Sequence, residues 1–110
     1  FIEYSFAWAL PLMWRINRTW QSLRYDVPWV TRPPREYVSE RVRFSTQPLD
    51  EPEDPAHLKA LIDMLGPKHL VFSTDYPHWD NDMPGQSLLM LDKDVRRQVL
   101  SDNANGILRL

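Results

Sequence analysis

The sequence predicts part of an α/β domain built on parallel strands, and three observations lead to this fold class. Short apolar or β-branched runs alternate with amphipathic helical segments along the 110 residues. The segment between the two clearest strands is longer than twenty residues, enough for the crossover that parallel pairing requires. Only three strands are predicted, and three strands cannot close a barrel or bury both faces of a sheet. We therefore expect this chain to form part of a larger domain.

The first half of the chain is divided by proline and by changes of hydrophobic period. The apolar run at Phe1–Tyr4 predicts the end of a buried strand. Helical spacing of apolar residues begins at Leu10 and must end before Val27, because a residue that precedes proline avoids helical geometry. Pro34–Glu40 predicts a short helix, since proline favours the first helical position, and Val42–Thr46 alternates as a short strand.

The helix predicted at Pro55–Leu65 has the clearest boundaries. Asp54 can accept hydrogen bonds from the free N–H groups of the first turn, and Gly66, followed by proline, ends the helix. One face must be buried against another element, because apolar residues recur on it at helical spacing. These residues are Leu58, Leu61, Ile62 and Leu65.

The remainder of the chain predicts one strand, one loop and two helices. The continuous apolar run in Leu70–Thr74 is typical of a parallel strand that is covered on both faces. Asp75–Gln86 is polar and predicts a long loop. Asp92 and Asp102 then precede two helical segments, where we expect them to act as caps.

Composition excludes several classes of function. The chain has no cysteine, which excludes disulfides, thiolate zinc sites and a cysteine nucleophile. Its net charge is −2, so no overall field attracts it to nucleic acid or to acidic membranes. No apolar run is long enough for a membrane span, and no signal peptide is visible. We expect a cytoplasmic protein and, because the sequence begins at Phe1 inside an apolar run, a longer polypeptide around it.

Two acidic residues follow predicted strands, at positions where active sites of parallel α/β domains lie. Asp75 follows the strand at Leu70–Thr74, and Glu3 follows the run at the N-terminus. Asp75 could bind a divalent metal or act as a general base, with His78 one turn further along the loop. The alternative for Asp75 is a carboxylate that caps a turn, and for His78 a solvated loop residue.

Other titratable side chains extend this set. Asp80 and Asp82 could join Asp75 in a group of oxygen ligands, although their spacing lacks the glycine and the distal glutamate of a calcium loop. We expect His57 and His69 to be solvated, because the first lies in the first turn of a helix and the second lies just before a strand.

The first 43 residues combine tryptophan with arginine. They hold seven arginines and four acidic residues, together with Trp8, Trp14, Trp20 and Trp29. Interleaved arginine and tryptophan could stack on nucleic-acid bases or bind a membrane surface, which would make the chain a binding module. The alternative, which we favour, is that these tryptophans pack beneath neighbouring elements while the arginines are solvated.

Three stretches resemble a known family. The one around Asp75 is similar to the last-strand motif of the amidohydrolase-related superfamily, in the branch that contains aminocarboxymuconate semialdehyde decarboxylase and resorcylate decarboxylases; it reads Leu70-Val71-Phe72-Ser73-Thr74-Asp75-Tyr76-Pro77-His78-Trp79-Asp80. Phe1–Trp8 resembles the sixth-strand motif of a bacterial subgroup. Ser101–Ala104, with Leu108, resembles the C-terminal helix. Together the three stretches cover nearly the whole chain in the family's order.

The resemblance implies a (β/α)8 TIM barrel, of which residues 1–110 would be the C-terminal fragment with about three strand–helix units. It implies that Asp75 is a catalytic residue and a metal ligand, and that Glu3 and His78 bind substrate or support the ligands. The family's histidine ligands come from earlier strands. The implied cofactor is a divalent metal, zinc or manganese.

The function implied by the resemblance is a metal-dependent hydrolase or non-oxidative decarboxylase that acts on a small organic amide, lactone or carboxylic acid. The metal would activate water and polarise a carbonyl or carboxylate. The resemblance also implies a homo-oligomer in the full-length form, with no nucleic-acid or membrane partner. Two alternatives stay open, which are a catalytically inactive truncated fragment and an Arg/Trp-rich binding module.

Overall fold

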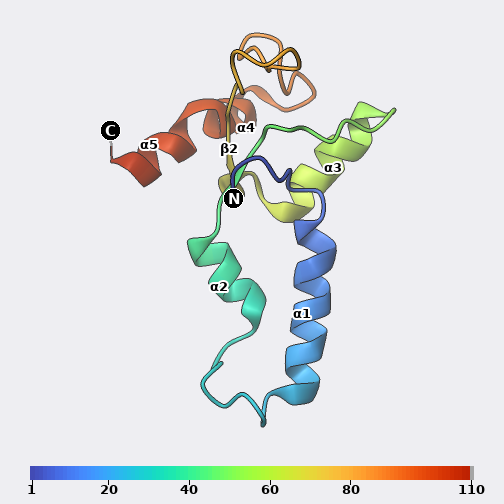
Figure 1. Ribbon diagram of the computed structural model, residues 1–110, viewed down its shortest axis with the longest axis vertical. Coiled ribbons are helices and arrows are strands. Elements are labelled where there is room, and N and C mark those ends of the chain that lie inside the picture. The colour runs from blue at the N-terminus through green and yellow to red at the C-terminus, as the bar shows by residue number, and fades with distance from the viewer. Residues whose placement is uncertain (110) are drawn as a thin grey trace.

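The computed structural model describes residues 1–109, and Leu110, the last residue of the predicted 1–110 domain, lies outside the described residues. Helices flank a short sheet, which is consistent with the predicted α/β class (Figure 1). The elements in chain order are α1 (Ala9–Leu23), α2 (Pro34–Arg41), β1 (Phe44–Ser45), α3 (Pro55–Leu65), the 3-10 turn η1 (Pro67–His69), β2 (Leu70–Val71), α4 (Lys93–Arg97), the π-helical turn η2 (Gln98–Asp102) and α5 (Asn103–Leu108).

The sheet consists of β1 and β2, which pair in parallel. Phe44 lies opposite Leu70, and Ser45 lies opposite Val71. The predicted parallel pairing is therefore confirmed, and α3 forms the crossover between the two strands. Because side chains alternate along a strand, Phe44 and Leu70 share the face that is buried in the core.

Both strands are shorter than the predicted Val42–Thr46 and Leu70–Thr74. The Thr46 N–H still donates to Val71 O at 3.0 Å. Beyond that bond, the Ser73 N–H donates to the side-chain Oγ1 of Thr46 at 3.2 Å instead of to a backbone carbonyl. A hydroxyl oxygen thus takes the place of a carbonyl, and the backbone ladder ends.

The N-terminal residue extends the sheet on the other side of β1. The Phe1 ammonium group donates to Arg43 O at 2.8 Å, and Phe1 O accepts from the Ser45 N–H at 2.9 Å, which is the pattern of a parallel pair. The predicted strand at Phe1–Tyr4 goes no further, because the backbone turns into the left-handed region at Glu3, where φ is 60°. The first of the three predicted strands is thus reduced to one paired residue.

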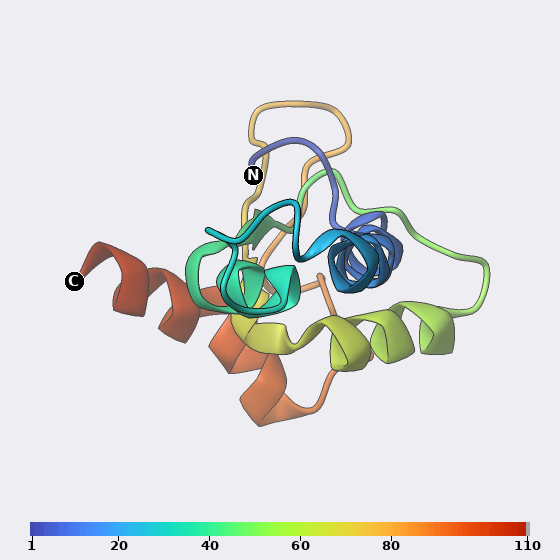
Figure 2. The same ribbon diagram turned by 90° about the horizontal axis from the view of Figure 1, so that it is seen from below.

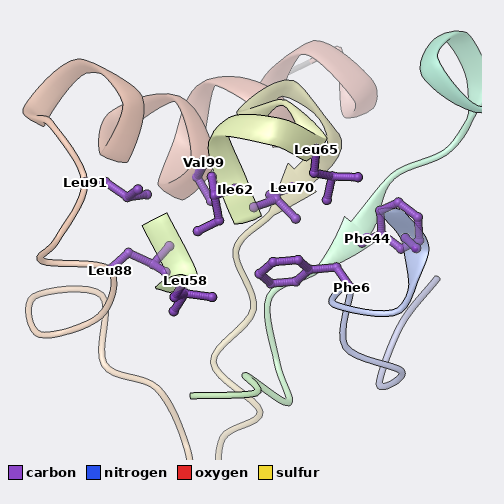
Figure 3. Packing of buried hydrophobic residues seen from close by; sticks show 10 residues of the cluster. Phe6, Phe44, Leu58, Ile62, Leu65, Leu70, Leu88, Leu91 and Val99 are labelled. Carbon is purple, nitrogen blue, oxygen red and sulfur yellow. The ribbon is translucent and has the colours of Figure 1, made fainter. Parts of the chain in front are cut away.

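The core lies between α3 and one face of the sheet (Figure 3). Asp54 Oδ1 accepts from the Ala56 N–H at 2.9 Å and caps α3 as predicted. The predicted apolar face of α3 is also confirmed, since Ile62 is fully buried and the rest of the stripe packs beside it. The other large apolar side chains of this core cluster come from the rest of the chain and are Phe6, Phe44, Leu70, Leu88, Leu91 and Val99.

The outer edge of β2, on the side away from β1, is covered by the C-terminal helices. The Phe72 N–H donates to Val99 O at 3.1 Å. The side-chain amide of Asn103 donates to Leu70 O at 2.7 Å and to Pro67 O at 2.8 Å. These bonds engage polar groups that an edge strand otherwise leaves unpaired.

The sheet face opposite the core is apolar and open. It borders a cavity of about 310 Å³ whose lining includes Ile2, Val71 and Ile107. Ile2 is 76% exposed and Ile107 is 50% exposed. Exposed apolar surface of this kind favours contact with another surface.

The C-terminal helices form one continuous stretch. Asp92 precedes α4 as predicted, but its side chain makes no capping hydrogen bond. The predicted start of a new helix at Asp102 is wrong, because Asp102 itself has helical dihedral angles (φ −63°, ψ −36°). Its carboxylate accepts from Arg97 Nε at 3.4 Å, on the preceding turn, rather than from the backbone ahead of it.

α1 and α2 lie side by side and project from the core as an arm (Figures 1 and 2). The expectation that tryptophans pack beneath neighbouring elements is wrong for Trp14 and Trp29, because these side chains lie largely in solvent. Trp20 is half-buried and donates from Nε1 to Val30 O at 3.0 Å. Within residues 1–109, no helix combines the length and the apolar character that crossing a membrane requires.

Candidate metal centre

The candidate site lies on the loop that follows β2, residues 75–82, which we call the Asp75 loop. The Asp82 N–H donates to Thr74 O at 2.8 Å and closes the loop, and the His78 N–H donates to Asp75 O at 2.9 Å inside it. Asp75 has a left-handed backbone with φ of 56°, which turns the chain sharply away from the strand direction. The loop therefore stands at the carboxyl end of β2, where sites of parallel sheets lie.

Asp75, His78 and Asp80 come together in this loop. Each offers one ligand atom, and the three atoms lie within 4.8 Å of one another. His78 Nδ1 lies 2.9 Å from Asp75 Oδ2. The Asp75 side chain is 25% exposed and that of His78 is 62% exposed, so the group is anchored on the protein side by Asp75 and open to solvent at His78.

The donor set fits a divalent ion of the zinc or manganese type. Imidazole nitrogen and carboxylate oxygen are ligands that such ions accept, and three protein ligands are the usual number at a catalytic zinc site. Ligand atoms that lie about 2.1 Å from a tetrahedral ion are about 3.4 Å apart. The ligand atoms of Asp75, His78 and Asp80, which all lie within 4.8 Å of one another, are therefore near the spacing that one ion requires.

Glu3 and Asp82 lie outside the group that the structure brings together in residues 1–109. Glu3 is exposed, and its backbone N–H donates to Ser45 Oγ at 3.2 Å. Asp82 Oδ1 accepts from Ser87 Oγ at 3.1 Å. Of the carboxylates that the sequence raised beside Asp75, the structure places only Asp80 with it.

The other two histidines have different surroundings. His57 is exposed as predicted, but His69 is only 4% exposed, so its predicted solvation is wrong. His69 Nδ1 lies 3.1 Å from Val42 O and carries the proton of that bond, because a carbonyl oxygen only accepts. Burial lowers the pKa of His69 below 6.5, the hydrogen bond to Val42 O opposes this, and the charges of Arg43 and Lys68 lower the pKa further.

Gln47 is a buried polar residue that the sequence analysis did not single out. It follows β1 and is 5% exposed. Its side-chain Nε2 donates to Asp80 O at 2.7 Å, and its Oε1 accepts from the Leu49 N–H at 3.0 Å. The signal in the sequence that could have revealed it is its position directly after a predicted strand, where parallel sheets carry functional residues.

The loops at this edge of the sheet are joined to one another. Ser5 Oγ donates to Asp50 Oδ2, which joins the turn after Phe1 to the loop after β1. Gln47 joins the loop after β1 to the Asp75 loop. Hydrogen bonds thus link the three segments that leave the carboxyl end of the sheet.

The chain matches the model of a known protein family. The family model described as amidohydrolase matches residues 4–110. The chain belongs to the amidohydrolase family, and this membership supports a metal-dependent hydrolase-type function in general. The search of curated proteins finds no match to the chain.

Proposed function

We propose that Asp75 is a metal ligand and the catalytic carboxylate of a metal-dependent amidohydrolase, with zinc or manganese as the ion. One observation carries the proposal: Asp75, His78 and Asp80 gather at the carboxyl end of β2 in a chain of the amidohydrolase family. We assign His78 the part of a ligand-supporting or substrate-binding residue, because its Nδ1 contacts Asp75. Glu3 keeps its proposed part as a residue that binds substrate or supports the ligands, and it contributes no atom to the group itself.

The chain would be the C-terminal part of a TIM barrel of the aminocarboxymuconate semialdehyde decarboxylase type. Support comes from Phe1, β1 and β2, which are paired in parallel in the order of the chain, with α3 on one face of the sheet. The apolar face opposite the core would then line the barrel interior. Further metal ligands would come from strands that this chain does not contain.

The chemistry follows from the donor set. A bound divalent ion lowers the pKa of water to about 7 and polarises a carbonyl or carboxylate group. Asp75 would hold one side of the site and could accept a proton at its carboxylate, while the His78 contact fixes the orientation of that carboxylate. Hydrolysis of a small amide or lactone and non-oxidative decarboxylation of a small carboxylic acid both use these parts.

A binding module is a second candidate, because Trp14 and Trp29 are exposed on or beside an arm that also carries arginines. Association through such a surface should weaken steeply with salt if the partner is a polyanion. A metal site in the Asp75 loop predicts no salt-sensitive binding of a polyanion to the arm. The salt dependence of polyanion binding therefore separates the two candidates.

The metal proposal is tested by Mn²⁺ titration of the chain, followed by paramagnetic broadening of its backbone amide signals. We expect broadening centred on residues 75–80. The Mn²⁺ dissociation constant should rise at least about tenfold in Asp75→Asn, because loss of a residue that only supports a ligand already weakens metal binding by about tenfold or more. Asp94→Asn is the matched control, because the Asp94 side chain is 91% exposed and belongs to α4. Equal Mn²⁺ affinity in both variants would overturn the proposal.

A further inference from the structure

The geometry points to Gln47 as a positioning residue that holds the Asp75 loop in its metal-binding form. The inference rests on the proposed metal role of that loop. It concerns a residue of a different element, the loop after β1, which contributes no atom to the group Asp75, His78 and Asp80. Gln47 would act through the main chain of Asp80.

All the polar groups of Gln47 are engaged. Its side chain donates to Asp80 O and accepts from the Leu49 N–H. Its backbone N–H donates to Ser73 Oγ at 3.3 Å, and its backbone carbonyl accepts from Ser45 Oγ at 2.9 Å. With 5% of its surface exposed, the residue has little freedom to adopt another rotamer without leaving a buried polar group unpaired.

The bond from Gln47 to Asp80 O is the link between the Asp75 loop and β1. The loop's other hydrogen bonds, within the part of the chain that the structure describes, remain inside residues 74–87; they include Asp82 to Thr74 and Asn81 Nδ2 to His78 O. Without Gln47 the loop would stay closed on itself but would lose its tie to the neighbouring strand.

That tie matters because two of the three ligand side chains are exposed. His78 and Asp80 are open to solvent, and the three ligand atoms lie within 4.8 Å of one another. Ion binding must therefore order side chains that are free to move, and a fixed main chain at Asp80 reduces the entropy lost in that step. Residues that support metal ligands in this way change metal affinity by about 10-fold to 100-fold when replaced.

The test compares the Mn²⁺ dissociation constants of two Gln47 variants with that of the unaltered chain. Gln47→Met keeps the size and removes both side-chain hydrogen bonds. Gln47→Glu keeps the acceptor for the Leu49 N–H but, when ionised at neutral pH, cannot donate to Asp80 O. We expect both variants to bind Mn²⁺ about tenfold more weakly. The Glu variant is the sharper probe, because a purely electrostatic effect of its added negative charge would strengthen binding.

Two controls separate positioning from general stability. Gln21→Met makes the same chemical change at an exposed position of α1 and should leave the affinity unchanged. Ile62→Ala lowers the unfolding temperature by removing core packing but lies outside the loop, so it should also leave the affinity unchanged well below that temperature.

The inference on Gln47 is overturned if Gln47→Met and Gln47→Glu bind Mn²⁺ as the unaltered chain does while Asp75→Asn has lost binding. Weakening in Ile62→Ala equal to that in Gln47→Met would overturn it too, since loss of stability alone would then explain the effect. If Asp75→Asn itself binds normally, the proposed metal role of the loop has failed instead.

Discussion

The ring of His69 lies between the end of α2 and the start of β2, in surroundings that disfavour its charged form. The pKa is lowered by burial first, and then by the positive charges of Arg43 and Lys68. A histidine whose pKa is lower in the folded state than in the unfolded state stabilises the fold while it is neutral. This stabilisation is present above about pH 6.5 and is lost as the pH falls below that value toward the folded-state pKa.

We therefore expect the free energy of unfolding to fall as the pH is lowered through about 6.5, and to fall less in His69→Gln. Glutamine does not titrate and can still donate to Val42 O. Denaturant unfolding at several pH values measures the free energy of unfolding, and the slope of this free energy against pH is compared between the proteins. Identical slopes in the unaltered chain and in His69→Gln would contradict the assignment.

At the level of single residues, the sequence predicted where a residue lies in the fold better than which other residues it contacts. Asp75 lies directly after an apolar run, and this local fact was enough to place it at the carboxyl end of a strand. The burial of His69 depends on the carbonyl of Val42, twenty-seven residues earlier, and no local pattern reports such a contact. The position of Gln47 after a predicted strand marks it as a candidate, but its contact with Asp80, thirty-three residues later, is likewise not reported by any local pattern.

Among the secondary-structure elements, β2 is bonded to a side chain outside the sheet. The Asn103 amide donates to both Leu70 O and Pro67 O. Removing it leaves two carbonyl oxygens at the start of the strand without these partners. A buried acceptor that loses its partner costs about 1–3 kcal/mol.

Asn103→Ala should accordingly lower the free energy of unfolding by about 1–3 kcal/mol. Asn105→Ala is the matched control in the same helix, because its side chain is exposed and, among residues 1–109, bonds only to Ser101 Oγ, at 3.3 Å. Its effect should stay within about 0.5 kcal/mol. Urea unfolding of the two variants measures the difference. Equal effects would mean that the amide of Asn103 does not support β2.

The helices were predicted closely because their signals are local. Asp54, the proline after it and Gly66 bound α3 within one stretch of sequence, and the apolar period fixes its buried face. The strands were predicted too long. They end where the Ser73 N–H donates to the side-chain Oγ1 of Thr46 instead of to a backbone carbonyl of the neighbouring strand. That choice is made between segments far apart in the chain.

On the scale of the whole molecule, the sheet has one apolar face in the core and one that is open. Ile2, Val71 and Ile107 border the open face. Self-association is the expected result in solution, because burial of such surface is favourable by about 25 cal/mol per Å².

Sedimentation velocity at increasing concentration should therefore show oligomers of the isolated chain. Ile2→Lys places a charge on the open face and should shift the distribution toward monomer. Leu12→Lys introduces the same charge on α1, at a residue that is 42% exposed, and should leave the distribution unchanged. A chain that stays monomeric at every concentration would contradict the expectation, as would an equal response to both substitutions.

Because the Phe72 N–H already donates to Val99 O, a further strand can join the sheet more easily beside Phe1 than beside β2. A strand that joins beside Phe1 extends the pairing that Phe1 begins, whereas a strand that joins beside β2 must first displace Val99 and Asn103. In a closed barrel of strands, another strand would therefore have to replace η2 beside β2. While η2 and α5 occupy this edge, they prevent strands of other chains from pairing with β2.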